Sequence, residues 1–465
     1  MLNTFLAEGL RRFEPTQPVR LIVEVPSAGL APQAAIELQA LPDVKVISRA
    51  FRFVTVRAPI GQLPRLEQAG VRVHYDLPRG MIVSPFVVDP FVGRFALSDI
   101  TVPFTPEEMA TRNLLNLPQA TLAAATTPLS VARLPSIKLT AVGTVIIPSI
   151  ESRALLGVPD DAQIKATRVA VIDTGMIFPH SMLHPFTLRP LLLSAILEPP
   201  LDFTGHGQWC ATALGGRKVR TRFGECQGTV LATGSSLMSV KGLNFRGFGS
   251  ISTILRAMEM AVRVGARVVS MSLGGPLQGS VDEDPECQVI RELKDDVIFV
   301  VAAGNDGPGA WTINSPGASP FALTVGAQGV RVVGVPAPYS SRGPSAPWYQ
   351  EHQDEWHRDL ARYGDSLRKP DVMAPGGGVQ QGDIKEVIYS GVTGWMNGTY
   401  DGNIFDLYDG MRGTSMATPQ VAGLVALAVE RGLIKTAADV KAKVGRGGKD
   451  STQGYGRITW SGLQA

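Results

Sequence analysis

Arg168–Gly175 has the sequence RVAVIDTG, an apolar run rich in β-branched residues that ends in a carboxylate and a glycine turn. Such a run is typical of a strand that is buried on both faces of a parallel sheet. In open α/β sheets, active sites lie at the carboxyl ends of these strands. The stretch therefore predicts a parallel α/β fold and places Asp173 at its functional edge.

Short apolar runs of the same kind recur downstream and alternate with segments that suit helices. The expected strands are Leu237–Val240, Arg267–Met271, Val297–Val301 and Ala322–Val325, and the expected helices are Ile254–Val262 and Gln288–Lys294. Strands that alternate with helices build β-α-β units, with helices on both faces of the sheet. We therefore predict a doubly wound, mostly parallel sheet.

Three further segments carry polar groups of the kind that nucleophilic catalysis uses. Residues 412–423 (RGTSMATPQVAG) place Ser415 at the start of a helix-periodic run, where free backbone N–H groups stabilise negative charge. Residues 202–211 (DFTGHGQWCA) set His206 between two glycines, and histidine is the usual general base near neutral pH. Asn305 follows another apolar run and offers a side-chain donor. Taken singly, each segment has a structural alternative as a helix cap, a turn or a loop.

In the order Asp, His, Asn and Ser, these segments resemble the subtilisin-like serine proteases (subtilases, peptidase family S8). The resemblance extends to SMSLGG at residues 270–275 and KPDVMAPG at residues 369–376. It implies a triad in which Ser415 is the nucleophile, His206 carries the proton and Asp173 orients the imidazole. It also implies that Asn305 donates a hydrogen bond to the oxyanion.

The same resemblance implies a binding cleft for extended polypeptide. Substrate would pair as an added strand against residues 270–274, and residues 302–305 would form a wall of the pocket for the residue before the scissile bond. The expected substrate-contacting residues are Ser270, Leu273, Gly274, Ala302 and Gly304.

Some residues depart from the family pattern or remain open in meaning. Gln208 and Trp209 stand where Thr and His are usual, and Gln420 stands where His is usual. Because position 209 lies near the triad in the family, we expect Trp209 to alter substrate access. The acidic residues of the stretch 282–286 either bias the cleft toward basic substrates or form a solvated loop.

Residues 19–76 form a separate pattern before the subtilase-like part. The expected strands are Arg20–Val25, Val44–Ser48, Phe51–Arg57 and Val71–Tyr75, and the expected helices are Pro32–Leu41 and Gln62–Ala69. The order β-α-β-β-α-β is that of the α+β ferredoxin-like motif. At this position it resembles the family's propeptide, a folding chaperone and inhibitor whose tail lies in the active cleft. An ordinary accessory domain is the alternative.

These patterns divide the chain into three parts. We expect a propeptide-like domain at 1–79, a linker or extension at 80–147 and a catalytic domain at 148–465, with a processing site between residues 76 and 147. The predicted function is a self-processing serine endopeptidase that acts through an acyl-enzyme. The alternatives are a maturation protease dedicated to one precursor and an inactive binding scaffold. The expected partners are polypeptide substrates and the chain's own N-terminal domain.

The composition fits a globular protein whose net charge is too small to create a strong electrostatic field. The 465 residues include 44 basic and 41 acidic residues, a net charge of +3 that gives no nucleic-acid signal. No apolar run is long enough to span a membrane, and residues 1–12 lack the order of a secretory leader. We expect a soluble protein that is either cytoplasmic or exported with a leader absent here.

Cysteines and acidic turns give weaker signals. Cys210, Cys226 and Cys287 cannot form a disulfide framework and fit no zinc pattern, although one pair could be bridged. The chemistry needs no cofactor. The resemblance makes structural calcium an expectation, with the oxygen-rich stretch 401–409 as a candidate region, but no metal ligand is assigned. A sequon at 397–399 matters only in an exported eukaryotic protein.

Overall fold

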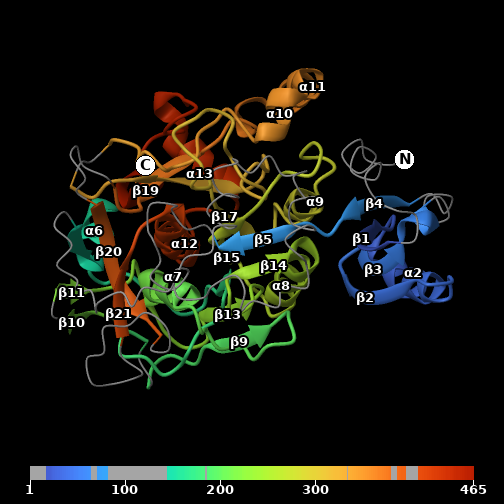
Figure 1. Ribbon diagram of the computed structural model, residues 1–465. Coiled ribbons are helices and arrows are strands. Elements are labelled where there is room, and N and C mark those ends of the chain that lie inside the picture. The colour runs from blue at the N-terminus through green and yellow to red at the C-terminus, as the bar shows by residue number, and fades with distance from the viewer. Residues whose placement is uncertain are drawn as a thin grey trace, which may run out of the picture.

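The computed structural model describes residues 17–63, 71–81, 144–183, 186–221, 223–331, 334–378, 385–393 and 407–465. A small N-terminal unit, blue in Figure 1, lies beside a larger body built around a seven-stranded sheet. The strand order of this sheet is β19-β18-β17-β15-β8-β13-β9, and every neighbouring pair is parallel. The prediction of a mostly parallel α/β sheet is confirmed. Its strands are β8 (Val169–Asp173), β9 (Leu191–Ser194), β13 (Leu237–Lys241), β15 (Val268–Met271), β17 (Ile298–Ala302), β18 (Leu323–Gln328) and β19 (Val372–Pro375).

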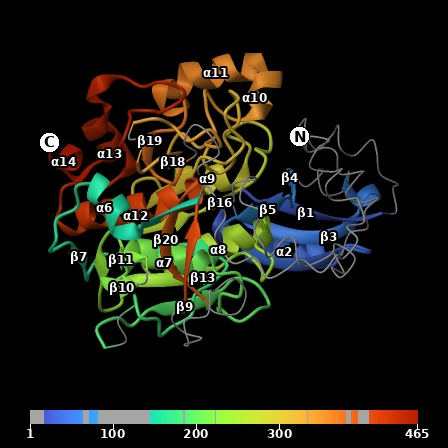
Figure 2. The same ribbon diagram turned by 60° about the vertical axis from the view of Figure 1, so that its left-hand side comes forward.

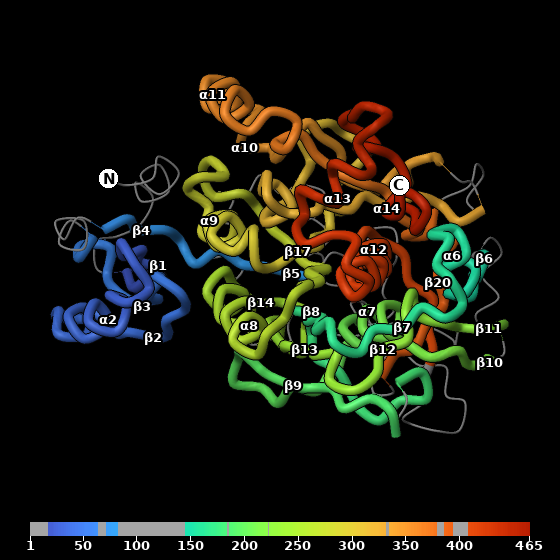
Figure 3. Tube along the Cα trace, turned by 180° about the vertical axis from the view of Figure 1, so that it is seen from behind, coloured from blue at the N-terminus to red at the C-terminus, as the bar shows by residue number. Residues whose placement is uncertain are grey.

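Helices cover both faces of this sheet because successive strand residues point to opposite sides. Val169 and Val171 of β8 pack in one core, with α7 (His206–Gly215) and α12 (Thr414–Glu430). Ala170 and Ile172 pack in the other, with α8 (Ile251–Arg263) and α9 (Pro285–Glu292). Figure 3 shows α8 and α12 on opposite sides of the sheet. The remaining helices of the larger body are α6 (Ser149–Leu155), α10 (Pro347–Glu351), α11 (Gln353–Tyr363), α13 (Ala437–Val444) and α14 (Trp460–Gln464).

The N-terminal unit is an antiparallel sheet with the order β2-β3-β1-β4. Its elements are β1 (Pro18–Glu24), α2 (Ala31–Gln39), β2 (Lys45–Ala50), β3 (Phe53–Pro59) and β4 (Arg72–Tyr75). Leu21, Val54 and Val56 form part of its own core. The predicted second helix, Gln62–Ala69, lies mostly outside the described residues. The four strands and the first helix lie where the sequence predicts them.

Strand β5 (Pro78–Met81) leaves the N-terminal unit and enters the larger body, as Figure 1 shows. It lies between β14 (Phe248–Ser250) and β16 (Leu273–Gly274), antiparallel to both. A second three-stranded sheet joins β6 (Thr144–Pro148) to β20 (Lys385–Val392) and β21 (Leu407–Met411). The expected boundaries at 79/80 and 147/148 thus each fall inside a strand.

The smaller features complete the larger body. Two short ribbons pair β7 (Gln163–Ile164) with β12 (Leu231–Ala232) and β10 (Val219–Thr221) with β11 (Gly224–Cys226). Helices α10 and α11 lie at one end of the larger body in Figures 1 and 2. They pack through an aromatic group that includes Trp311, Tyr349 and Trp356.

Several sequence expectations fall outside the described residues. These are most of the linker, the sequon at 397–399, and Asp401, Asn403 and Asp406. Within the described part of the chain, no helix combines the length and apolar character that a membrane span requires.

Candidate active site

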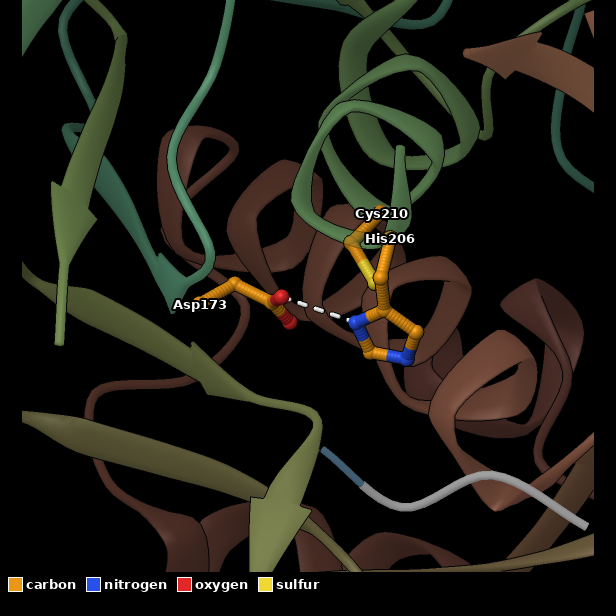
Figure 4. A group of neighbouring side chains, drawn as sticks. All are labelled: Asp173, His206 and Cys210. Atoms are coloured by element: carbon orange, nitrogen blue, oxygen red, sulfur yellow. Dashed lines mark hydrogen bonds and ion pairs between the residues drawn. The ribbon is translucent and has the colours of Figure 1, made fainter. Parts of the chain in front are cut away.

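The carboxyl end of β8 and the start of α7 bring Asp173 and His206 together. His206 Nδ1 lies 2.7 Å from Asp173 Oδ1, and both side chains are buried (Figure 4). The backbone N–H of Thr174 donates to the same carboxylate oxygen at 2.7 Å. This contact holds the carboxylate toward the imidazole. The pair has the geometry of a general base and the acid that orients it.

A buried carboxylate that the sequence analysis assigned no role, Asp202, fixes the loop before His206. Its Oδ1 accepts hydrogen bonds from Thr204 N (2.8 Å), Gly205 N (3.0 Å) and Thr174 Oγ1 (2.9 Å). Glycine is required in the first turn of α7, because a Cβ on Gly207 would lie 2.4 Å from the carbonyl oxygen of Gly175. Asp202 therefore ties the loop after β8 to the first turn of α7. In the sequence, the feature that could have pointed to this role is an aspartate four residues before the histidine.

Ser415 lies in the first turn of α12, and a proline shapes its surroundings. Pro419 has no N–H, so the carbonyl of Ser415, four residues earlier, receives no helical hydrogen bond from it. That carbonyl instead accepts from Ser272 Oγ at 2.9 Å and contacts Cys210 Sγ at 3.7 Å. Ser415 Oγ in turn donates to the carbonyl of Ser272 at 3.1 Å. The nucleophile candidate is thus held against the residue that precedes β16.

The thiol of Cys210 joins the predicted triad segments. Its Sγ lies within 4.8 Å of the Asp173 and His206 atoms and also contacts the Ser415 carbonyl. Asp173, His206 and Cys210 are all residues of kinds that can bind a metal, and among the described residues their potential ligand atoms lie close together. However, Asp173 Oδ1 is already engaged by the imidazole. Burial, followed by the charge of Asp173, raises the pKa of Cys210 well above its ordinary value, so the thiol stays protonated. The cluster fits a catalytic pair with a packed thiol better than a metal site.

Asn305 is oriented by the residue before Ser415. Its Oδ1 accepts from Thr414 N at 2.9 Å and from Thr414 Oγ1 at 3.1 Å. These two contacts fix the orientation of the side-chain amide, with its oxygen toward Thr414. This orientation suits a donor to an oxyanion formed beside Ser415.

The predicted substrate-contacting residues lie in three places. Leu273 and Gly274 form β16, which pairs antiparallel with β5. Ala302 and Gly304 end and follow β17, next to Asn305. Ser270 is different, because it lies inside β15, buried between β8 and β17. Its predicted contact with substrate is therefore wrong.

The three residues that depart from the family pattern, Gln208, Trp209 and Gln420, are all buried and make hydrogen bonds inside the protein. Trp209 is fully buried, and its indole N–H donates to the carbonyl of Ile388 at 3.2 Å. Gln208 accepts from Ile177 N at 2.7 Å, and Gln420 donates to the carbonyl of Pro375 at 2.8 Å. The expectation that Trp209 alters substrate access is wrong, because its side chain is fully buried against β20.

The acidic stretch 282–286 is only partly a solvated loop. Asp284 and Glu286 are fully buried, and they surround the side chain of Arg79 on β5. Burial raises the pKa of Glu286 to about 7, while the Arg79 guanidinium acts in the opposite direction. Sequence reasoning missed Arg79, which lies beside the expected domain boundary.

Among the described residues, the group of three or more His, Cys, Asp or Glu side chains close enough to share a metal is Asp173, His206 and Cys210, which is not the all-oxygen ligand set that calcium prefers. Asp409 of the predicted acidic region lies in β21, where its Oδ1 accepts from Gly410 N at 2.7 Å. The other members of that region lie outside the described residues. No calcium ligand is therefore assigned.

Taken together, the groups of the candidate site are of the kinds that acyl transfer uses. A serine sits at a helix N-terminus, an imidazole is paired with a buried carboxylate, and a side-chain amide is oriented beside the serine. These are the parts that nucleophilic attack on a carbonyl requires.

Comparison with known proteins agrees with this geometry. The profile of the subtilase family (peptidase S8) matches residues 165–456. Pyrolysin of Pyrococcus furiosus is 37% identical over 208 residues, which cover 43% of this chain and 14% of pyrolysin. Serine protease AprX of Bacillus subtilis is 30% identical over 293 residues, 60% of each chain. Subtilisin Savinase of Lederbergia lenta is 28% identical over 286 residues, 61% of this chain and 81% of Savinase. The chain thus spans less than two thirds of pyrolysin and of AprX.

Proposed function

Because the chain belongs to the subtilase family, we propose that it is a serine endopeptidase with the triad Ser415, His206 and Asp173. The observation that carries the proposal is the buried imidazole–carboxylate pair, with Nδ1 and Oδ1 2.7 Å apart, at the carboxyl end of the sheet. The contact of Cys210 with both this pair and the Ser415 carbonyl supports the third member.

In the proposed reaction, Ser415 Oγ attacks the scissile carbonyl while His206 accepts its proton. The Asp173 carboxylate stabilises the resulting imidazolium, and Asn305 donates a hydrogen bond to the oxyanion. His206 then returns the proton to the leaving amine, which leaves an acyl-enzyme on Ser415. Water, deprotonated by His206, hydrolyses that ester and restores the serine.

We further propose that residues 17–81 act as a propeptide that occupies the substrate edge, with the catalytic part beginning at β6. Strand β5 lies where an added strand of substrate would lie, paired with Leu273 and Gly274. The N-terminal unit reaches the larger body through further contacts. Tyr75 and Gln278 exchange two hydrogen bonds, and Asp76 accepts from Ser252 N and Oγ at 2.8 Å.

The register of β5 also bears on self-processing. Met81 pairs with Leu273, and the preceding residue, Ser272, hydrogen-bonds with Ser415. In an antiparallel pair, one step back along β16 corresponds to one step forward along β5, so the residue after Met81 is the one in register with Ser272. We therefore place the expected first cleavage within the few residues that follow Met81.

The test is intact-mass spectrometry of wild type and Ser415→Ala, followed by a fluorophosphonate probe. The wild type should lose an N-terminal fragment and gain the probe, whereas the alanine variant stays whole and unlabelled. Edman or mass sequencing of the new N-terminus then locates the cleavage. A wild-type protein that does not process itself, and that stays unlabelled even after an added protease has cut within the region 82–143, would identify an inactive scaffold instead.

Structural calcium, which is common in subtilases, is part of this proposal without assigned ligands. Thermal unfolding with and without EDTA tests it. A melting temperature that EDTA leaves unchanged argues against bound calcium.

A further inference from the structure

The edge that receives β5 contains a buried acidic pocket, and its occupant is an arginine. Arg79 pairs with Gly249 of β14, two residues before the residue that pairs with Leu273. The side chain of Arg79 is fully buried. Arg79 therefore occupies a side-chain pocket of the polypeptide-binding edge.

The guanidinium group meets one carboxylate directly and a second at longer range. Arg79 Nε donates to Glu286 Oε2 at 2.8 Å, and Nη2 lies 2.7 Å from the same oxygen. Asp284 Oδ2 lies 3.7 Å from Nη2. Both carboxylates are fully buried. Gly275 leaves room for this side chain, since a Cβ there would lie 2.8 Å from Nη1.

The two acids differ in what else holds them. Asp284 caps α9 and accepts from Cys287 N (3.1 Å), Ser315 Oγ (3.0 Å) and Gln278 N (3.2 Å). Glu286, among the described residues, has Arg79 as its side-chain hydrogen-bonding partner, and its Oε1 is buried without one. The fold thus satisfies Asp284 by itself, whereas Glu286 depends on a cation brought by the strand in the cleft.

We propose that this pocket selects polypeptide substrates with arginine at the position that Arg79 occupies. The proposal rests on the proposed endopeptidase function. A buried carboxylate strongly favours an occupant that brings the opposite charge and hydrogen bonds. Lysine is a poorer fit, because its compact ammonium group cannot reproduce the contact of Nε and Nη2 with Oε2.

Glu286 is the specificity-determining residue in this proposal, and α9 offers a matched control. Glu292 lies on the same helix and pairs with Arg52 of the N-terminal unit, away from the pocket. Glu286→Gln removes the charge that Arg79 meets, whereas Glu292→Gln removes a charge that holds only the N-terminal unit. The two variants separate substrate selection from docking of that unit.

The experiment starts from the full chain and lets it process itself. It then measures how fast the resulting enzyme cleaves quenched-fluorescence peptides. The parent peptide has the sequence of residues 76–87, and three others carry lysine, citrulline or methionine in place of Arg79. Citrulline keeps the shape of arginine and removes its charge. Active sites are counted with the fluorophosphonate probe, so kcat/KM refers to functional enzyme in every variant.

We expect wild type to cleave the arginine peptide about 100-fold faster in kcat/KM than the citrulline peptide, with lysine between them. Glu286→Gln should lose most of this discrimination, and Glu292→Gln should keep it. The wild-type comparison of peptides does not depend on the folding of any variant.

Two results would overturn the proposal in different ways. If probe-labelled wild type cleaves the arginine and citrulline peptides at rates within about 3-fold of each other, the pocket serves only to dock the N-terminal unit. If no peptide is cleaved and no probe is incorporated, the endopeptidase function itself fails, and the substrate preference with it.

Discussion

Replacing Asp173 by asparagine tests the proposed catalytic pair most directly. The carboxylate oxygen that contacts His206 Nδ1 at 2.7 Å also accepts from Thr174 N, and the side chain is fully buried. Asparagine has the same shape, so the fold should survive. It lacks the charge that stabilises the imidazolium in the transition state.

The size of the effect follows from this geometry. Two unit charges about 4 Å apart attract by about 4 kcal/mol at an effective dielectric constant of about 20. At 1.36 kcal/mol per tenfold change in rate, that corresponds to about 10³-fold. The amide can also hold the imidazole in the wrong tautomer, which brings the expected loss to about 10⁴-fold.

The assay is kcat/KM on the parent peptide, together with the rate of fluorophosphonate labelling. Asp161→Asn is the matched control, because it makes the same change in an exposed carboxylate that pairs with Arg431. Circular dichroism and thermal unfolding should show both variants folded. A folded Asp173→Asn protein that retains more than a tenth of wild-type activity would refute the assigned role of Asp173.

Five other tests probe separate parts of the chain. Asn305→Ala should lower kcat by about 10²–10³-fold with little change in KM, the loss that removal of such an amide causes in subtilisin; equal kcat values would argue against an oxyanion donor. Asp371→Asn should destabilise the fold by about 3–5 kcal/mol in urea unfolding, because it leaves the buried Lys369 without its charge partner at 2.7 Å; a loss below about 1 kcal/mol would contradict this. Burial acts to raise the pKa of Asp371, but Lys369, Lys441 and Lys449 outweigh it and lower that pKa below the ordinary 3.8, so its stabilisation should be complete above pH 3.8 and decline as pH falls further. Leu424→Ala should cost about 2–5 kcal/mol, because Leu424 is fully buried in the core between α12 and the sheet, and an unchanged unfolding midpoint would show that the core refills the space. Cys210 should resist iodoacetamide in the native protein and react once urea unfolds it, because burial keeps it a protonated thiol; rapid native modification counted by mass would contradict this.

The sequence by itself determined the parallel sheet and the identity of the candidate catalytic residues. Runs such as Val169–Asp173 are stable only as inner strands of a sheet that is covered on both faces, because an apolar strand without alternation has no side that suits water. The glycines around His206 meet local backbone requirements, a positive φ at Gly205 and a close approach to Gly175 at Gly207, and such requirements are visible in local sequence. Local patterns of this kind also located the four strands of the N-terminal sheet.

Only the tertiary structure decided which residues meet across long separations in the chain. Ser270 and Leu273 are three residues apart, yet one is enclosed by the main sheet and the other lies on the edge that receives β5. Trp209 follows the candidate base His206 by three residues, but its side chain is fully buried and bonds to Ile388 of β20. Arg79 and Glu286 are separated by 207 positions and form one buried pair. No local pattern could have joined them, because the free energy of burying a charge depends on the partner that the fold brings to it.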